Sequence, residues 1–133
     1  MSSQSFLVLV TGNPTTSQAH LSAIRFIKAA IVAGHKISSI FFYQDAVNVA
    51  NRFVLKPSDE AQLSQEWQTL SSQHNIELQV CVAAANRRGV VDQAEAEQNA
   101  IDSHSIVDTF KVLGLGQLAA AFSDPTQKLV QFK

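Results

Sequence analysis

Short apolar runs alternate along this chain with segments in which apolar residues recur every three or four positions. The runs have the length and β-branched content of strands buried on both faces, and the other segments have helical spacing. Strands that alternate with helices indicate a parallel sheet covered on both faces. We therefore predict one α/β domain over residues 1–133, with α/β/α layers and a mainly parallel sheet of about five strands.

The element boundaries are predicted from run lengths and from residues typical of helix ends. The strands are expected over 6–10, 37–43, 76–82, 110–113 and 129–132. The helices are expected to begin near 15–17, 45, 58–59, 83, 92 and 117. Ser58 or Asp59 is predicted to cap the third helix. Asp92 has capping-box spacing to Glu95, and Gly34 suits the position after the first helix.

Composition narrows the classes of function. Apolar residues make up 46% of the chain and charged residues 16%, a balance typical of a packed domain with part of its surface against partner subunits. Ten basic and eleven acidic side chains give a formal charge of -1, which disfavours direct binding to nucleic acid or to an anionic membrane. No apolar run approaches the ~20 residues of a membrane span, and residues 1–5 lack the basic region of a signal peptide.

Cys81 is the one cysteine of the chain, so an internal disulfide is excluded and we expect a reducing compartment, the cytoplasm. It falls at the carboxyl end of the third predicted strand, where α/β proteins gather their reaction sites. A helix over 83–88 would direct free N–H groups at the sulfur and stabilise a thiolate, and its small alanines would leave room for a partner's cysteine. An accessible, anionic sulfur is therefore expected. The alternative is a buried core thiol, because free cysteine packs like a small apolar residue.

The segment around this cysteine, Val80 to Asp92, resembles the cysteine region of the DsrE/TusD family. The likeness continues through residues 41–47, 57–60, 114–116 and 130–132, so it covers nearly the whole chain at unshifted spacing. Asn86 stands where relatives are expected to have an apolar residue, and a few residues are added at the N-terminus. Neither difference removes the cysteine.

The resemblance implies a DsrE-like fold and a sulfur carrier in which Cys81 is the persulfide-bearing nucleophile. It implies TusB-like and TusC-like partner subunits in a heterohexamer, built as a dimer of heterotrimers. It also implies a transient TusA-like donor and TusE-like acceptor, with the sulfur destined for 2-thiolation of tRNA wobble uridine. Exchange at sulfur between two proteins needs no second thiol, metal or organic cofactor. Two alternatives remain within the family. One is a subunit for dissimilatory sulfur metabolism, and the other is a noncatalytic structural subunit, which the retained Cys81 disfavours.

Gly12 and Asn13 follow the first strand and suggest an alternative function of another class, in which the chain is a nucleotide-binding α/β module. The loop lacks the Walker lysine and the glycine spacing of a dinucleotide fingerprint, so an ordinary strand-to-helix turn is favoured. Because it lies at the same sheet edge as Cys81, the loop is also a candidate wall of the cysteine site.

Tyr43, Asp45, Arg87 and Arg88 complete the candidate lining of the cysteine site. Tyr43 and Asp45 follow the second strand, whereas the two arginines stand at the end of the helix after Cys81. The arginines are candidates for binding an anion or orienting a partner, although contact with helix carbonyls and solvent is their commoner role. No zinc site is predicted, because the histidines are scattered without ligand spacing: His20, His35, His74 and His104.

Overall fold

Five strands form one sheet with the spatial order β4-β3-β2-β1-β5. The computed structural model describes residues 3–133, and every pair of neighbouring strands in it is parallel. The strands are β1 (Ser5–Val10), β2 (Lys36–Phe42), β3 (Leu78–Cys81), β4 (Phe110–Leu113) and β5 (Lys128–Phe132). The predicted α/β class and parallel sheet are confirmed. Met1 and Ser2, part of the segment compared with a signal peptide, lie outside the described residues.

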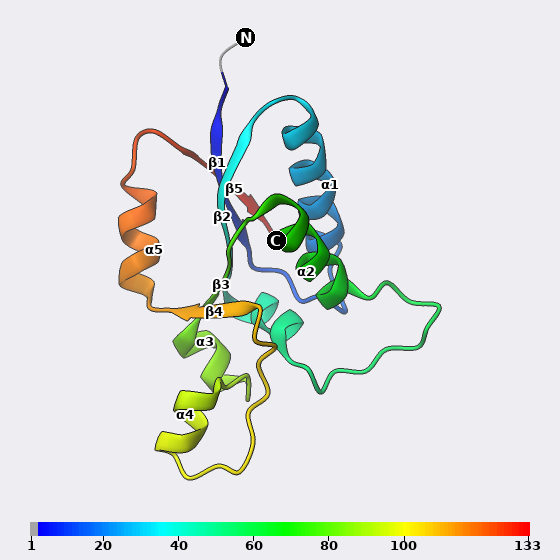
Figure 1. Ribbon diagram of the computed structural model, residues 1–133, viewed down its shortest axis with the longest axis vertical. Helices are drawn as coiled ribbons and strands as arrows, with labels where there is room; N and C mark the ends of the chain where they lie inside the picture. The colour runs from blue at the N-terminus through cyan, green and yellow to red at the C-terminus, as the bar shows by residue number, and fades with distance from the viewer. Residues whose placement is uncertain (1–2) are drawn as a thin grey trace.

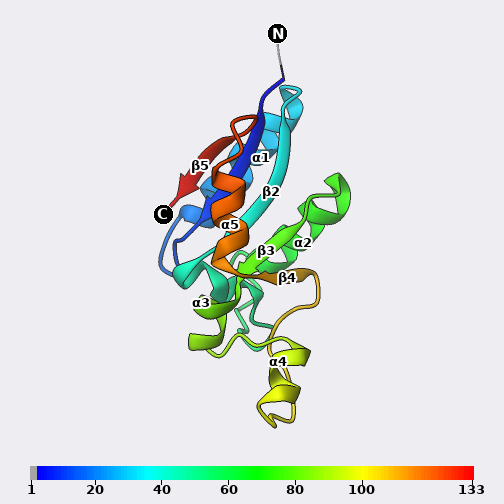
Figure 2. The same cartoon turned by 90° about the vertical axis from the view of Figure 1, so that its left-hand side faces the viewer.

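Helices cover both faces of the sheet. α1 (Ala19–Val32) and α2 (Leu63–His74) lie on one face, and α5 (Leu115–Phe122) lies on the other (Figures 1 and 2). Short helices lie beyond the carboxyl ends of the strands: η1 (Gln44–Ala50), which is a 3-10 helix, α3 (Val82–Arg87) and α4 (Gln93–Gln98). None of the helices within residues 3–133 has the length and apolar character needed to span a bilayer.

The α1–α2 face is filled by a cluster that we call the aromatic layer: His20, Phe42, Trp67 and Phe110. The Phe42 ring lies 5.0 Å from the Trp67 ring and 5.6 Å from the Phe110 ring, both edge-on. His20 stacks on Phe42 at 5.8 Å. Each large side chain removed from water in this way contributes roughly 1.5–3 kcal/mol, so the aromatic layer is a main source of the fold's stability.

His20 is the polar member of the aromatic layer, and both of its ring nitrogens have partners. Trp67 Nε1 donates to His20 Nδ1 at 3.0 Å, so the ring proton lies on Nε2, which donates to the Gly12 carbonyl at 2.9 Å. Burial lowers the pKa of His20 to about 4, and the nearby positive charge of Lys56 contributes to the decrease. The imidazole is therefore neutral at pH 7 and ties the turn after β1 to α2.

The helix ends test the predictions from capping residues. Gly34 follows α1 with a φ of 89°, a backbone conformation that glycine tolerates best, and the Asp92 carboxylate accepts a hydrogen bond from the Glu95 N–H at 2.8 Å. Both of these predictions are confirmed.

The predicted start of α2 is wrong. The helix begins at Leu63 rather than at 58–59, because the preceding residues form a turn. The Glu60 N–H donates to the Pro57 carbonyl at 3.0 Å, and the Gln62 side chain donates to the same carbonyl at 3.0 Å. Residues 51–62 are therefore a loop, which extends away from the body of the molecule in Figure 1.

Candidate functional site

Cys81 ends β3 and immediately precedes α3. The helix covers Val82–Arg87, and Gly89 follows it with a φ of 75°. The expected strand, short helix and glycine stop after the cysteine are thus confirmed. The sulfur lies at the carboxyl edge of the sheet, next to the first turn of α3.

Cys81 lies on the α5 face of the sheet, opposite the aromatic layer. Val80 is the β3 neighbour of Phe42, which belongs to the aromatic layer. Side chains alternate along a strand, so the next residue, Cys81, projects to the other face. Its neighbour on β4 is Leu113. On β2, Tyr43 follows Phe42 and extends the ladder through its N–H bond to the Val10 carbonyl at 2.9 Å.

The expectation of an accessible sulfur is wrong for this state of the protein, because Cys81 is 0% exposed. Two features enclose it. β3 has a strand on each side, and α3 packs against η1 just beyond the strand end. The small side chains of Ala84 and Ala85 are themselves buried, so they leave no open space for a partner's cysteine. This burial agrees with the alternative prediction of a core cysteine. The thiol can therefore react with another protein only after a movement of the chain exposes it.

A groove of about 360 Å³ lies on the same face as Cys81, between α5 and the sheet. It is uncharged, and its lining includes Tyr43 and Gln44 after β2, and Leu115 and Phe122 from α5. α5 covers the face lightly, because Leu118 is the buried residue among its eight. Sequence reasoning missed these α5 residues, although the amphipathic pattern after the fourth strand was the available signal.

An ion pair joins Arg88, the residue after α3, to η1. Arg88 Nε donates to Asp45 Oδ1 at 2.9 Å, and Arg88 Nη1 donates to the Ala84 carbonyl at 3.0 Å. The structure thus brings together two of the predicted site residues, from segments that follow β2 and β3. Arg87 is exposed and forms no ion pair within residues 3–133. The pair is partly exposed, so it contributes about 0–1 kcal/mol to holding α3 on η1.

Gly12 is required by close packing. A Cβ there would lie 2.6 Å from Ser17 Oγ and 2.7 Å from both the Ala19 Cβ and the Lys133 carbonyl carbon. The space that a phosphate would need at this glycine is therefore filled by protein atoms. Asn13 Oδ1 accepts the Thr15 N–H at 2.8 Å, as in an ordinary polar turn. The structure separates this loop from the groove on the Cys81 face.

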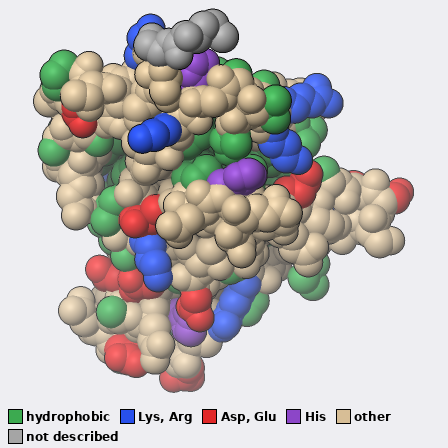
Figure 3. All heavy atoms as spheres, turned by 45° about the horizontal axis from the view of Figure 1, so that its top comes forward, with side chains coloured by type: hydrophobic (Ala, Val, Ile, Leu, Met, Phe, Trp, Pro, Cys, Tyr) green, Lys and Arg blue, Asp and Glu red, His purple; other side chains and the backbone are tan. Residues whose placement is uncertain are grey.

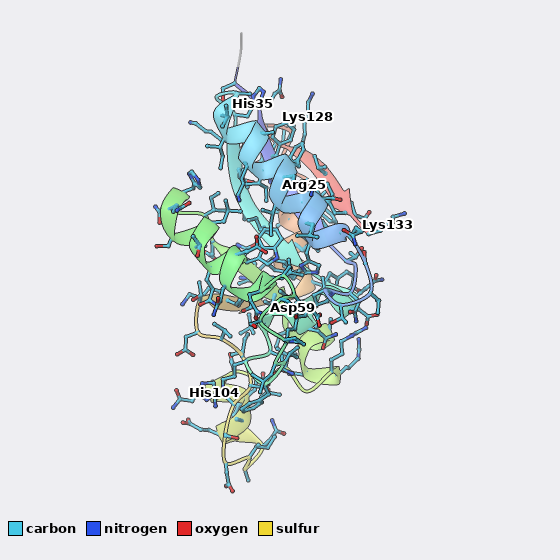
Figure 4. The ribbon with its side chains drawn as sticks, turned by 90° about the vertical axis from the view of Figure 1, so that its right-hand side faces the viewer. Arg25, His35, Asp59, His104, Lys128 and Lys133 are labelled. Atoms are coloured by element: carbon cyan, nitrogen blue, oxygen red, sulfur yellow. The ribbon has the colours of Figure 1, made fainter. Side chains whose placement is uncertain are left out.

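The histidines lie in different parts of the molecule. His35 lies near the start of β2 and His104 lies in the α4 region at the other end (Figure 4). Within residues 3–133, no three His, Cys, Asp or Glu side chains gather as a potential metal site.

The similarity to known proteins extends over nearly the whole chain. The DsrE/DsrF-like family matches residues 4–132. A "Sulfurtransferase TusD homolog" of Vibrio vulnificus strain CMCP6 is 42% identical over 132 residues, which are 99% of this chain and 100% of the relative. The protein of the same description from strain YJ016 is 41% identical over the same lengths.

A solved structure has the same fold. The crystal structure of the ychN protein from E. coli aligns with a TM-score of 0.72, over 97% of this chain and 99% of that one. The sequences share 20% identity, so this likeness concerns the arrangement of helices and strands.

Proposed function

Because this chain belongs to the DsrE/DsrF-like family, as the segment around its cysteine predicted, we propose that it is a sulfurtransferase whose Cys81 carries sulfur as a persulfide. One observation supports this most directly. The only cysteine ends β3 just before α3, in a chain that is 42% identical over nearly its full length to a protein described as a sulfurtransferase.

The proposed reaction consists of two exchanges at sulfur. The Cys81 thiolate attacks the outer sulfur of a donor persulfide, the donor S–S bond breaks, and the donor leaves as a thiolate. An acceptor thiolate then attacks the outer sulfur on Cys81, which leaves as a thiolate in turn. Each step forms one S–S bond and breaks one, so no external oxidant or reductant is consumed. With no second thiol in the chain, the cargo is not lost to an internal disulfide.

The enclosed thiol reacts after a local opening. α5 is the best candidate to move, because it begins two residues after Leu113, the β4 neighbour of Cys81, and Leu118 is its buried anchor. Segments with few buried apolar contacts open at a lower free energy than the core does. The α3–η1 contact, held by the Arg88–Asp45 pair, is the second closure to be released.

The α5 face is also the proposed contact surface for TusB-like and TusC-like subunits in a heterohexamer. Leu115 and Phe122 on α5 and Leu129 on β5 are 45%, 46% and 46% exposed. Leu129 is the β5 neighbour of Leu7, two residues before Leu9 in the groove, so it shares that face. Large apolar side chains gathered on one face are typical of a protein–protein contact.

We propose that Cys81 receives its sulfur from a TusA-like donor and passes it to a TusE-like acceptor. The sulfur is then used to thiolate the wobble uridine of tRNA, in the cytoplasm. Deleting the gene is expected to remove 2-thiouridine from tRNA digests analysed by mass spectrometry. Unchanged thiolation with lost sulfur oxidation would instead assign the chain to dissimilatory sulfur metabolism.

Persulfide loading followed by intact-mass spectrometry tests the residue and the reaction together. Incubation with glutathione persulfide is expected to add about 32 Da, one sulfur atom, to the protein with and without its copurified subunits. Cys81→Ser is expected to stay unmodified. Equal loading of the variant, or no loading of either protein, contradicts the proposal.

A further inference from the structure

A second cavity, of about 550 Å³, lies on the other side of η1 from α3 and has no lining residue in common with the α5 groove. The turn after β1, η1, the loop after η1 and the first turns of α2 line it. This size is in the range of small-molecule sites, about 300–1,000 Å³. Its place beyond the carboxyl ends of β1 and β2 is also where α/β folds bind ligands.

The charged side chains that line this cavity are both cations, Arg52 and Lys56. On the surface that Figure 3 shows, by contrast, basic and acidic side chains are interspersed. Neither cation forms an ion pair within residues 3–133, although Lys56 is half-buried. A partly desolvated ammonium without a counter-charge is unfavourable, and an anionic ligand would remove that cost.

Two side-chain amides of the cavity, those of Asn13 and Asn51, present donors, whereas Asn48 and Gln62 use their NH₂ groups within the protein. Asn13 Oδ1 is occupied by the Thr15 N–H at 2.8 Å, and Asn51 Oδ1 is occupied by the Phe53 N–H at 2.9 Å. Each of these asparagines lines the cavity and keeps its NH₂ group without a protein partner among the described residues. Two cations and two amide donors that converge on one space match the oxygens of an anion.

Apolar side chains form another part of the lining, beside further uncharged polar ones. Val54, Leu55 and Leu63 lie beside the polar groups, together with Pro14 and Val107. A ligand that fills the cavity therefore combines an anionic group with an apolar or flat part. Two cations balance the charge of about −2 on a phosphate monoester better than the single charge of a carboxylate.

We propose that this cavity is a binding site for a small phosphate monoester that carries a ring, with the phosphate on Lys56, Arg52, Asn13 and Asn51. Recognition would use side chains, in contrast to a glycine-rich phosphate loop, because the space at Gly12 is filled. The site lies apart from Cys81 and does not depend on the proposed sulfur transfer.

Titration followed by ¹⁵N–¹H NMR tests the site with three probes. AMP carries both phosphate and ring, inorganic phosphate carries only the anion, and adenosine carries only the ring. AMP is expected to shift the backbone signals of Asn13, Asn51 and Lys56 saturably, phosphate to do so more weakly, and adenosine to leave them unchanged. Lys56→Gln is expected to weaken AMP binding about tenfold, because a charge-assisted hydrogen bond is lost.

Matched variants distinguish binding at this cavity from a general effect of positive charge and from the reaction at Cys81. Lys36→Gln removes an exposed lysine at the start of β2, at the opposite edge of the sheet, and is expected to bind AMP unchanged. Cys81→Ser is expected to keep AMP binding, and Lys56→Gln to keep sulfur loading. Absence of saturable shifts at millimolar AMP, equal binding by the two lysine variants, or binding of adenosine as tight as that of AMP would overturn the proposal.

Discussion

The face of the sheet under α1 and α2 and the face under α5 use the same five strands but bury their side chains to different degrees. On the first face, the aromatic layer is fully enclosed and its polar member, His20, has a partner for each ring nitrogen. On the second, a single short helix leaves a groove and half-exposed leucine and phenylalanine side chains. Stability is concentrated on one face, and the cysteine lies on the other.

This division suits a protein that needs both a firm scaffold and an opening. Strands shared by the two faces keep the backbone around Cys81 in place while its cover moves. A movement of α5 would break few buried contacts, whereas a movement of α2 would expose Trp67 and leave His20 without its donor. The difference between the faces therefore predicts where mutations change stability and where they change access to the thiol.

Removing the largest side chain of the aromatic layer should have the greatest effect. Trp67→Ala is expected to lower the free energy of unfolding by about 4 kcal/mol, because it creates a cavity and removes the donor to His20. Phe122→Ala, at an α5 residue that is 46% exposed, is the control and is expected to cost less than about 1 kcal/mol. Urea denaturation measures both values. Equal losses would contradict the contrast between the faces.

The enclosed histidine predicts a pH dependence of stability. Burial holds the pKa of His20 at about 4 in the folded protein, below its ordinary 6.5, so the unfolded chain takes up the proton first as pH falls. The contribution of neutral His20 to the free energy of unfolding is fully present above pH 6.5. About 3 kcal/mol of it is lost as the pH falls to 4. Urea denaturation of wild type and of His20→Gln between pH 7 and pH 4 should show the steeper decline in wild type. Parallel curves would refute this role.

Loosening the anchor of α5 should open the cysteine. Leu118→Ala is expected to raise the rate of Cys81 alkylation by iodoacetamide roughly tenfold, because truncating a buried leucine costs about 2 kcal/mol or more. Leu115→Ala, at a residue that is 45% exposed, should leave the rate nearly unchanged. The rate is measured by intact-mass spectrometry in native buffer. If both variants react as slowly as wild type, α5 is not the moving cover.

Breaking the ion pair between α3 and η1 should have the smallest effect. Arg88→Gln is expected to raise the alkylation rate of Cys81 about two- to fivefold, because a partly exposed pair contributes about 0–1 kcal/mol. Arg87→Gln, at the neighbouring arginine that forms no ion pair among the described residues, is the control. The double exchange Asp45→Arg with Arg88→Asp should restore slow alkylation. Failure of that rescue would show that the pair does not hold the closure.

The fold was largely predictable because its signals are local. Continuous apolar strands separated by helical spacing require a parallel sheet covered on both faces, and the cap at Asp92 and the glycine at 34 fixed two helix ends. The start of α2 was not predictable from Ser58 or Asp59, since Pro57 and the Gln62 side chain form a competing turn.

The candidate site was predictable only in part, because burial is a property of neighbours distant in sequence. The position of Cys81 at the end of β3 follows from its own segment, whereas its enclosure depends on β2, β4 and the packing of α3 on η1. The close approach of Lys133 to Gly12 and the meeting of Asn13 with Lys56 in one cavity are likewise tertiary. No local pattern encodes them.

The pairing of β5 with β1 affects how the chain folds during its synthesis on the ribosome. Thr11 Oγ1 and the Phe132 carbonyl, which share a hydrogen bond, are 121 positions apart in sequence. Of the described elements, α5 and β5 leave the ribosome last, so β1 remains an unprotected edge and the α5 face of the sheet stays uncovered until they dock. A nascent chain thus passes through an interval in which foreign strands can reach surfaces that the finished protein conceals.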